Sequence, residues 1–256
     1  MSLKNKVCII TGSGSGIGRG AATKMAQQGA KVVLIGRTAE KIEAVKDQIE
    51  ADGGIAKAFV LDVADHIATH KMAKETLNIF GRIDILVNNA GHSSPHRRLL
   101  TSTPEEIHGV INSNLVGTIF CTQAVVPAML EAREGTIINV SSIAALTPGP
   151  LSGAAYSAAK AAIINFTHFI NADLPNTGIR ASVIIPGEVT TPILDKRPIP
   201  PSSEARQQMV DVEETSATIC HIANLPIRTN IPELIILPTM QRDLSEEFPP
   251  LQYEIF

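Results

Sequence analysis

The sequence has few aromatic side chains: it contains no tryptophan, two tyrosines and seven phenylalanines among 256 residues. A core built on stacked rings is therefore excluded. Hydrophobic residues nevertheless make up 44% of the chain, so the core must consist mainly of Ile, Val, Leu and Ala. This length and apolar content are typical of one large α/β domain, and we expect residues 1–256 to form a single domain.

Cysteine and long apolar runs are also scarce. Cys8, Cys121 and Cys220 are odd in number and lie in apolar stretches, which argues against a disulfide framework and predicts buried thiols in a reducing compartment. The apolar run from Val7 to Ile10 is too short for a signal peptide, and we expect no later segment to span a membrane. These absences predict a soluble, cytoplasmic protein.

The chain also lacks a strong charge of either sign. Its formal net charge is −3, which gives no basic surface for nucleic acid or for an anionic membrane, so neither is expected as a partner. His66 and His70 have the spacing of zinc ligands on a helix, but residue 67 is Ile and no third ligand is evident. A solvated helix face is the favoured interpretation, and no metal is expected.

Short β-branched runs alternate with longer amphipathic segments along most of the chain. We predict strands at 6–11, 31–36, 56–61, 82–88, 135–141, 178–186 and 232–238. Helices are predicted at 17–28, 38–51, 65–79, from about 103 to 132, around the alanine-rich stretch at 154–162, and at 203–224. The pattern predicts a Rossmann-type, doubly wound parallel sheet of about seven strands with helices on both faces, which binds ligands at the carboxyl ends of its strands.

The last quarter of the chain differs in character. Prolines crowd residues 186–201, a segment long enough to form a mobile lid, and we assign 190–224 as the substrate-loop region. Residues 239–256 form a C-terminal tail that packs either on a neighbouring subunit or on the active site; the sequence leaves both alternatives open.

A glycine-rich turn follows the first strand. It runs Thr11-Gly12-Ser13-Gly14-Ser15-Gly16-Ile17-Gly18 and opens a predicted helix. Glycines let backbone N–H groups approach a phosphate, and a helix N-terminus adds its positive end, so a phosphate site is favoured over a plain tight turn.

The end of the second strand indicates which dinucleotide binds. Enzymes that bind NAD(H) usually have a carboxylate at this position, and a carboxylate would repel the 2′-phosphate of NADP(H). This chain has the cation Arg37 there, with Thr38 as a further donor, which favours NADP(H) over NAD(H) as the cofactor. An arginine that faces solvent at a helix start is the alternative. Asp62, after the third strand, is placed either to accept from an adenine amino group or to cap a helix.

The stretch AAYSAAKAA places Tyr156 and Lys160 four residues apart in a run of strong helix formers. Residues at this spacing lie on one helix face, so a phenol would lie beside an ammonium. A nearby cation favours the phenolate and lowers the pKa of the tyrosine. A packing tyrosine with a lysine that reaches solvent is the alternative for an isolated pair of this kind.

Several motifs in order resemble the short-chain dehydrogenase/reductase family: TGSGSGIG at 11–18, NNAG at 88–91, SNLVG around Asn114, SS at 141–142, YSAAK at 156–160 and PGEVTT at 186–191. The likeness covers residues 6 to about 190. It implies that Tyr156 is the general acid/base and that Lys160 lowers its pKa and holds the nicotinamide ribose. It also implies that Ser142, rather than Ser141, orients the substrate oxygen, and that Asn114 orders a relay water leading to Lys160.

The same resemblance implies the remaining cofactor contacts. Pro186, Gly187, Val189 and Thr191 would close over the nicotinamide, and the NNAG segment would line the adenosine side. The predicted cofactor-binding residues are Gly12, Ser13, Ser15, Gly16, Ile17, Gly18, Arg37, Thr38, Asp62, Val63, Asn89, Ala90, Gly91, Tyr156, Lys160, Pro186, Gly187, Val189 and Thr191.

Two departures from the family pattern concern the substrate end. Ser142 precedes Tyr156 by fourteen residues, one more than the commonest family spacing, so the loop at 147–150 is expected to bulge into the substrate cleft. The RTNIPELIILPT stretch at 228–239 replaces the family's frequent Asp-Gly-Gly and resembles members that use NADP and act on hydroxy acids and other small alcohols. His92, His96, Arg97 and Arg98 could attract an acidic substrate, with an ordinary polar loop as the alternative.

Together these features predict an NADP(H)-dependent oxidoreductase that interconverts an alcohol and a carbonyl, with a small-molecule substrate. The alternatives are a non-catalytic NAD(P)-binding regulatory protein of the same fold, and an epimerase or dehydratase that uses the same Tyr and Lys. The alanine-rich helix carries more apolar residues than one face needs, and in relatives it forms subunit contacts, so a homodimer or homotetramer is expected.

Overall fold

The computed structural model describes residues 2–244 and 247–248. Seven strands form one sheet in the order β3-β2-β1-β4-β5-β6-β7, and every neighbouring pair is parallel. The strands are β1 Val7–Thr11, β2 Lys31–Gly36, β3 Ile55–Val60, β4 Ile85–Asn88, β5 Gly135–Val140, β6 Ile179–Pro186 and β7 Glu233–Ile236. The predicted seven-stranded, doubly wound fold is therefore confirmed.

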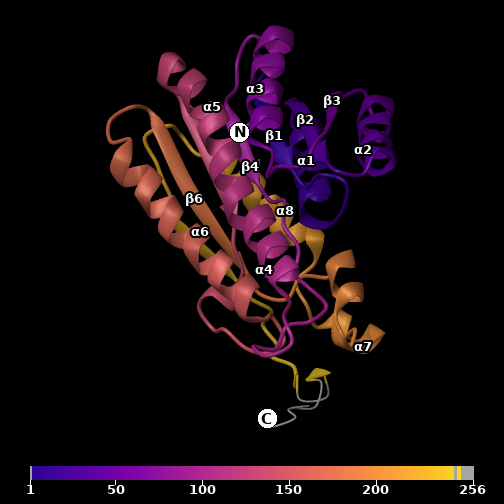
Figure 1. The fold of residues 1–256 in the computed structure, drawn as a ribbon. Coiled ribbons are helices and arrows are strands. Elements are labelled where there is room, and N and C mark those ends of the chain that lie inside the picture. The colour runs from indigo at the N-terminus through magenta and orange to yellow at the C-terminus, as the bar shows by residue number, and fades with distance from the viewer. Residues whose placement is uncertain (1, 245–246, 249–256) are drawn as a thin grey trace.

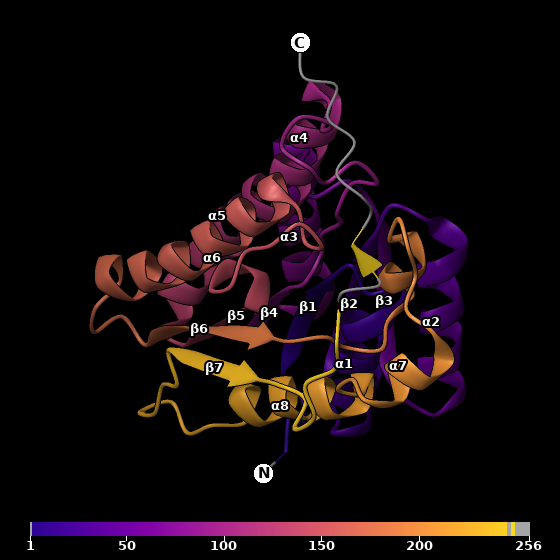
Figure 2. The same cartoon turned by 90° about the horizontal axis from the view of Figure 1, so that it is seen from below.

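Helices cover both faces of the sheet. They are α1 Gly16–Gln27, α2 Ala39–Ala51, α3 His66–Phe80, α4 Pro104–Ile111, α5 Gly117–Ala132, α6 Ala154–Asp173, α7 Ser203–Gln207 and α8 Val212–Ala223. Figure 2 shows α3, α5 and α6 on one side of the strands and α1 and α8 on the other. The long α5 and α6 run in the same layer, on the face of the sheet that α3 also covers (Figure 1).

The alternation of side chains along the strands builds two cores. In β1, Cys8 and Ile10 pack toward α1 and α8, whereas Val7 and Ile9 pack toward α3 and α5, and all four are fully buried. Both faces of a central strand are therefore apolar, as a parallel sheet covered on both sides requires. The three cysteines are buried and free, as predicted, and burial raises the pKa of Cys121 to about 12 and that of Cys220 to about 11.

Two predicted helices are interrupted. The helix at 103–132 starts with a capping box at Thr103, but a π-helical turn at Asn112–Val116 separates α4 from α5. Single π turns of this kind often occur at functional sites. The helix at 203–224 is wrong as one element: Val210 forms a β-bridge with Val189, and Asp211 then caps α8 with its own capping box. The backbone must leave the helix to make that bridge.

The run Pro104–Ala132 also differs from the sequence expectation about membranes. By length and composition it is apolar enough to cross a membrane, although no such segment was expected. In this structure the run belongs to the globular domain: α5 packs on α3, β4 and β5, and α4 packs on α6.

A buried carboxylate joins the amino ends of β1 and β4. Asp84 accepts hydrogen bonds from Lys6 Nζ at 3.1 Å, from the Val7 amide at 2.8 Å and from the Arg82 guanidinium. Burial alone would raise the pKa of Asp84, but the bonds from Arg82, Val7 and Lys6 outweigh it and lower the pKa below its ordinary value. The ionised carboxylate therefore stabilises the fold at neutral pH, on the edge of the sheet opposite to the strands' carboxyl ends.

We expect Asp84→Asn to lower the free energy of unfolding by about 3 kcal/mol at pH 7, because it leaves buried donors facing a neutral amide. A lowered carboxyl pKa contributes stability above the unfolded-state value, near pH 4, and loses it as the pH falls through the folded-state value. The difference from wild type should therefore shrink below about pH 4. Urea unfolding from pH 3 to pH 7 tests this, with Asp173→Asn on the exposed surface of α6 as the control. A difference that does not change with pH would contradict the assignment.

Candidate active site

A cavity of about 450 Å³ opens where the central strands of the sheet end. These carboxyl ends meet at one edge, and the chain crosses from β1 to the neighbouring β4 by way of the far strands, the place where such folds bind ligands. Most of the predicted site residues line this one cavity. They are Gly12, Ser15, Gly16, Ile17, Asn89, Ala90, Gly91, Asn114, Ser142, Tyr156, Lys160, Pro186, Gly187, Val189 and Thr191.

Other predicted residues lie outside the cavity lining. Ser13 is fully buried, and both its amide and its hydroxyl donate to the Ile35 carbonyl, so its side chain faces β2. Gly18 lies at the interface between α1 and β4, where a Cβ would come within 2.4 Å of Asn89 Nδ2 and of the Gly12 carbonyl. Val63 is buried against Gly117. Ser13 and Gly18 therefore shape the glycine turn on the side away from the cavity, and Val63 packs against α5.

The glycine turn has the geometry of a phosphate cradle. Gly12 and Gly16 adopt φ of +65° and +52°, a left-handed conformation that favours glycine. The helix α1 begins at Gly16, and its N-cap residue Ser15 makes no side-chain capping bond. The first amides of α1 therefore remain available for a negatively charged group at the positive end of the helix.

The predicted 2′-phosphate residues lie together at the end of β2. Arg37 Nη1 is 3.6 Å from Asp62 Oδ2, and both side chains are largely exposed. Thr38 is the N-cap of α2 but makes no side-chain capping bond. The capping interpretation of Asp62 is wrong: Asp65 caps α3 by accepting from Ala68, whereas Asp62 accepts from the amide of Ala64.

Thr11 fixes the NNAG segment to the glycine turn. Its hydroxyl oxygen accepts from the amides of Asn89 at 3.0 Å and Ala90 at 2.9 Å. The Asn89 side chain in turn donates to the carbonyls of Thr11 and Gly12. These bonds hold the ends of β1 and β4 together, so the two segments that line the cofactor end of the cavity form one rigid wall.

Tyr156 and Lys160 lie one turn apart on α6 and face the cavity. Lys160 Nζ lies 5.6 Å from the centre of the Tyr156 ring and donates to the Val140 carbonyl at 2.8 Å. Burial lowers the pKa of Lys160 to about 8. A buried amine of this kind changes its protonation close to physiological pH.

The electrostatics of Tyr156 differ from the sequence prediction. Burial raises the pKa of the phenol above its ordinary value, and this outweighs a side-chain hydrogen bond with Ser142 and the charges of Arg97 and Arg197, which act to lower it. The predicted lowering of the pKa by Lys160 is therefore wrong for this structure, in which Ser142, Arg97 and Arg197 oppose the effect of burial. Arg197 lies in the proline-rich segment and was not predicted as a site residue.

The two serines at 141 and 142 have different partners. Ser141 is buried, and its hydroxyl donates to the Lys160 carbonyl at 2.7 Å, which anchors α6 to β5. Ser142 lies at the start of a short 3-10 turn, Ile143–Ala145, where it accepts from the Ala144 amide and bonds to Tyr156. Ser142 rather than Ser141 therefore reaches the reactive end of the cavity.

Asn114 lies in the π-helical turn and is fully buried. Its side-chain amide donates to the His92 and Val110 carbonyls, both at 2.8 Å, which aims the opposite end of the side chain toward Gly91. Asn114 Oδ1 has no partner among the described residues. A Cβ at Gly91 would lie 2.2 Å from that oxygen and 3.5 Å from Lys160 Nζ. Glycine thus leaves open the space between the amide oxygen and the ammonium, which fits the predicted relay.

The substrate end of the cavity is formed by segments far apart in the sequence. Thr147 and Gly149, from the loop that was expected to bulge into the substrate cleft, line the cavity. Leu244 and Phe248 of the tail also line it, which favours packing on the active site over packing on a neighbour for this part of the tail. Residues 245–246 and 249–256 of the predicted tail lie outside the described residues.

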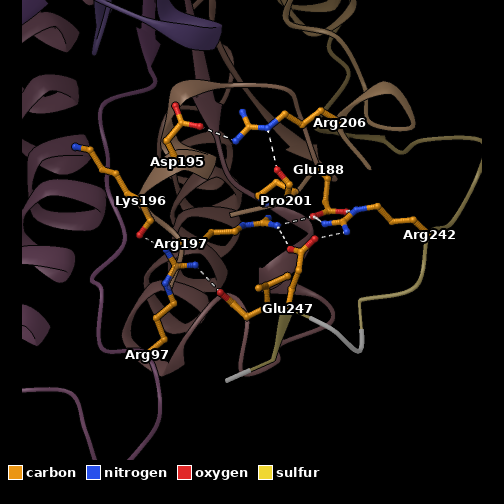
Figure 3. A network of polar contacts seen from close by, with 10 residues as sticks. Arg97, Glu188, Asp195, Lys196, Arg197, Pro201, Arg206, Arg242 and Glu247 are labelled. Atoms are coloured by element: carbon orange, nitrogen blue, oxygen red, sulfur yellow. Dashed lines mark hydrogen bonds and ion pairs between the residues drawn. The ribbon is translucent and has the colours of Figure 1, made fainter. Parts of the chain in front are cut away.

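An ion network ties the tail to the loop that follows β6. Arg197 donates to Glu188 and Glu247, each at 2.9 Å, and Arg242 pairs with the same two carboxylates (Figure 3). The hydrogen bonds from Arg242 and Arg197 outweigh burial and lower the pKa of Glu188. Only the position of Glu188, inside the PGEVTT motif, could have marked this network in the sequence.

The remaining candidates from the sequence have structural partners. His92 bonds to Ser113 at 2.8 Å and His96 to Glu106 at 2.9 Å. His70 Nδ1 bonds to the His66 carbonyl, and its ring packs on that of His66. Within residues 2–244 and 247–248, no three His, Cys, Asp or Glu side chains lie close enough together to hold a metal ion.

The chain is similar in sequence to one protein family and to several relatives. The family model of short chain dehydrogenases matches residues 6–199. The chain is 40% identical over 199 residues to the (2S)-[(R)-hydroxy(phenyl)methyl]succinyl-CoA dehydrogenase subunit BbsD of Thauera aromatica, covering 77% of this chain and 79% of that protein. It is 36% identical over 200 residues to the 3-oxoacyl-[acyl-carrier-protein] reductase FabG of Thermotoga maritima, covering 77% and 80%.

Two solved structures extend the similarity to nearly the whole chain. A metagenomic short-chain oxidoreductase in complex with NADP superposes with a TM-score of 0.81 at 31% identity and covers 94% of this chain and all of that one. The closed form of serine dehydrogenase complexed with NADP⁺ gives a TM-score of 0.84 at 28% identity, with 98% and 100% covered.

The lowered pKa of Lys160 predicts a specific pH dependence of stability. Between about pH 8 and the ordinary lysine value of 10.5, the unfolded chain holds a proton that the folded chain has released. Wild-type stability should therefore rise relative to Lys160→Met, by about 3 kcal/mol over that interval. Denaturant unfolding at pH 7.5, 9 and 10.5 measures the difference. The exposed Lys71→Met on α3 is the control, and equal slopes for both variants would contradict the buried position of the amine.

Proposed function

The chain belongs to the short-chain dehydrogenase family, and we propose that it is an NADP(H)-dependent oxidoreductase that interconverts an alcohol and a carbonyl. The observation that carries the proposal is the convergence of Ser142, Tyr156 and Lys160 on one cavity that continues to the glycine turn. A dinucleotide in the cradle would bring its nicotinamide to the same place as the phenol. Its phosphates would meet the amides at the start of α1.

The cofactor, when bound, supplies or accepts a hydride at the nicotinamide ring. The protein's own groups handle the proton and the geometry. The Tyr156 hydroxyl donates its proton to the carbonyl oxygen in reduction and takes it back from the alcohol in oxidation. Ser142 donates a hydrogen bond to the same oxygen and orients it.

Lys160 and Asn114 provide a route by which the proton on Tyr156 is replaced. With a pKa of about 8, Lys160 gives up and regains a proton readily at neutral pH. The Asn114 amide oxygen faces the same space across Gly91. The charges of Arg97 and Arg197 stabilise the phenolate that remains after proton transfer.

We assign the cofactor preference to the end of β2. Arg37 supplies a cation, and the Thr38 hydroxyl at the N-terminus of α2 supplies a donor for a 2′-phosphate. Asp62, 3.6 Å from Arg37, holds the guanidinium in place. The NADP complexes among the similar structures support this preference.

Replacement of Tyr156 tests the proposed chemistry. We expect Tyr156→Phe to bind NADPH as wild type does and to lose at least about 10³-fold in kcat, since the ring remains and only the proton donor is removed. NADPH fluorescence titration and NADPH oxidation with a panel of ketones, aldehydes and oxo acids measure the two quantities. If the variant keeps more than a tenth of wild-type kcat, Tyr156 is not the general acid.

Replacement of Arg37 tests the cofactor preference. Arg37→Gln removes the charge that faces the 2′-phosphate, so KM for NADPH should rise about tenfold or more while KM for NADH stays within about twofold. Lys74→Gln, an equal change of charge on the exposed side of α3, should alter neither value. Equal increases for both cofactors would refute the assignment of Arg37 to the 2′-phosphate.

A further inference from the structure

One cation at the substrate end of the cavity has no carboxylate partner among the described residues. Arg97 is 8% exposed and lines the cavity together with Ser142 and Tyr156. Its guanidinium donates to three backbone carbonyls: Nε to Ser94 at 2.8 Å, Nη1 to Leu151 at 2.6 Å and Nη2 to Lys196 at 3.5 Å. Figure 3 shows it beside Arg197, which by contrast contacts two carboxylates.

A second buried arginine, Arg180, provides a comparison, because all of its N–H groups donate hydrogen bonds to carbonyl or hydroxyl oxygens. Arg180 is 6% exposed and uses all five of its N–H donors, on the Thr136 hydroxyl and on four backbone carbonyls between β6 and the segment after α8. Arg180 does not line the cavity. Arg97 lines the cavity and makes one hydrogen bond from each of its three nitrogens, so each of its two Nη groups keeps one further N–H.

The charges of the residues that line the cavity also indicate that Arg97 is available to bind an anion. Among the described cations that line the cavity, Arg197 contacts Glu188 and Glu247, whereas Arg97 and Lys160 contact no carboxylate. A buried cation that only carbonyl dipoles offset is costly, and an anion placed against it recovers part of that cost. Lys160 faces the cofactor end beside Asn114 and Gly91, so Arg97 is the cation left for the substrate.

The position of Arg97 relative to the reactive groups fixes what it can hold. The guanidinium lines the same cavity as Ser142 and Tyr156, where the carbonyl oxygen must bind. Its charge opposes the effect of burial, which raises the pKa of the phenol. A guanidinium can bind two oxygens of either a carboxylate or a phosphate, but a single cation balances the single charge of a carboxylate and only half of a phosphate's double charge.

We propose that Arg97 binds a carboxylate of the substrate, so that the enzyme acts on oxo acids and the corresponding hydroxy acids. The inference rests on the proposed oxidoreductase function and names the substrate class of that same site. Arg97 binds the anionic end while Ser142 and Tyr156 hold the carbonyl oxygen. The lining of the same cavity also includes Thr147, Gly149, Leu244 and Phe248.

The test compares acids with their neutral counterparts. Two-, three- and four-oxo acids of four to six carbons are each measured against their methyl esters, with NADPH oxidation as the readout. For the preferred chain length, wild type should show kcat/KM at least about 100-fold higher for the acid than for the ester. Arg97→Gln also removes a charge that stabilises the Tyr156 phenolate, so the value for the ester should fall as well. The value for the acid should fall at least about tenfold further than that for the ester, and Arg97→Lys should recover part of the acid activity.

Each result decides between a binding role and a merely structural one. A role that does not include binding the carboxylate, in which Arg97 only ties the three loops or acts on Tyr156, would lower acid and ester activity by the same factor, and that result overturns the proposal. Equal wild-type activity on acids and esters overturns it as well, while the oxidoreductase function stands. If wild type binds NADPH but reduces no carbonyl of either kind, the proposed function itself fails.

A measurement on wild type alone keeps the test valid if Arg97→Gln does not fold. A saturated, non-reducible carboxylate of the preferred length should inhibit ester reduction competitively, with a Ki at least about tenfold below that of its primary amide. Equal inhibition by the acid and the amide would overturn the proposal.

Discussion

The burial of the Lys160 ammonium is the constraint on which the geometry of the site depends. A cation can stay in the interior only where fixed dipoles offset its lost hydration, and the Val140 carbonyl at the end of β5 does so at 2.8 Å. Ser141 bonds to the backbone of the same residue, so α6 is tied to β5 at this one level. The position of Lys160 is thereby fixed. Tyr156 lies one helical turn before it on the same face of α6, so Tyr156 also faces the cavity.

A buried polar network carries this constraint across the molecule. Asn139 of β5 bonds to Thr167 of α6 and to Asn88 of β4, and Asn88 bonds to Thr122 of α5. Hydroxyl-to-carbonyl bonds along α5 continue from Thr122 to Thr118 and on to the carbonyl of Asn114. Buried networks in which nearly every member is satisfied specify a single packing, so α5 and α6 cannot slide over the sheet without breaking it. The Asn114 amide and the part of α6 that carries Tyr156 and Lys160 thereby keep one relative position.

The sequence was sufficient for features that depend on local periodicity and short motifs. Strand alternation predicted the sheet, and the spacing of Tyr156 and Lys160 predicted their shared helix face, because both follow from backbone geometry. It was not sufficient where distant segments meet. The break at 208–211 depends on a bridge to Val189. The two charges that partly offset the effect of burial on the Tyr156 pKa belong to Arg97 and Arg197, which lie 59 residues before and 41 residues after it in the chain. Contacts between residues so far apart in the chain cannot be predicted from a local sequence pattern.

The most direct test of the account is whether a hydride passes from the cofactor to a carbonyl carbon in this cavity. NADPH deuterated separately at each face of C4 is incubated with wild-type enzyme and the carbonyl panel, and the products are analysed by mass spectrometry and NMR. The account predicts an alcohol carrying one deuterium on the former carbonyl carbon, from one face of the nicotinamide only. A product without deuterium, or tight NADPH binding with no reduced product from any carbonyl, would contradict it.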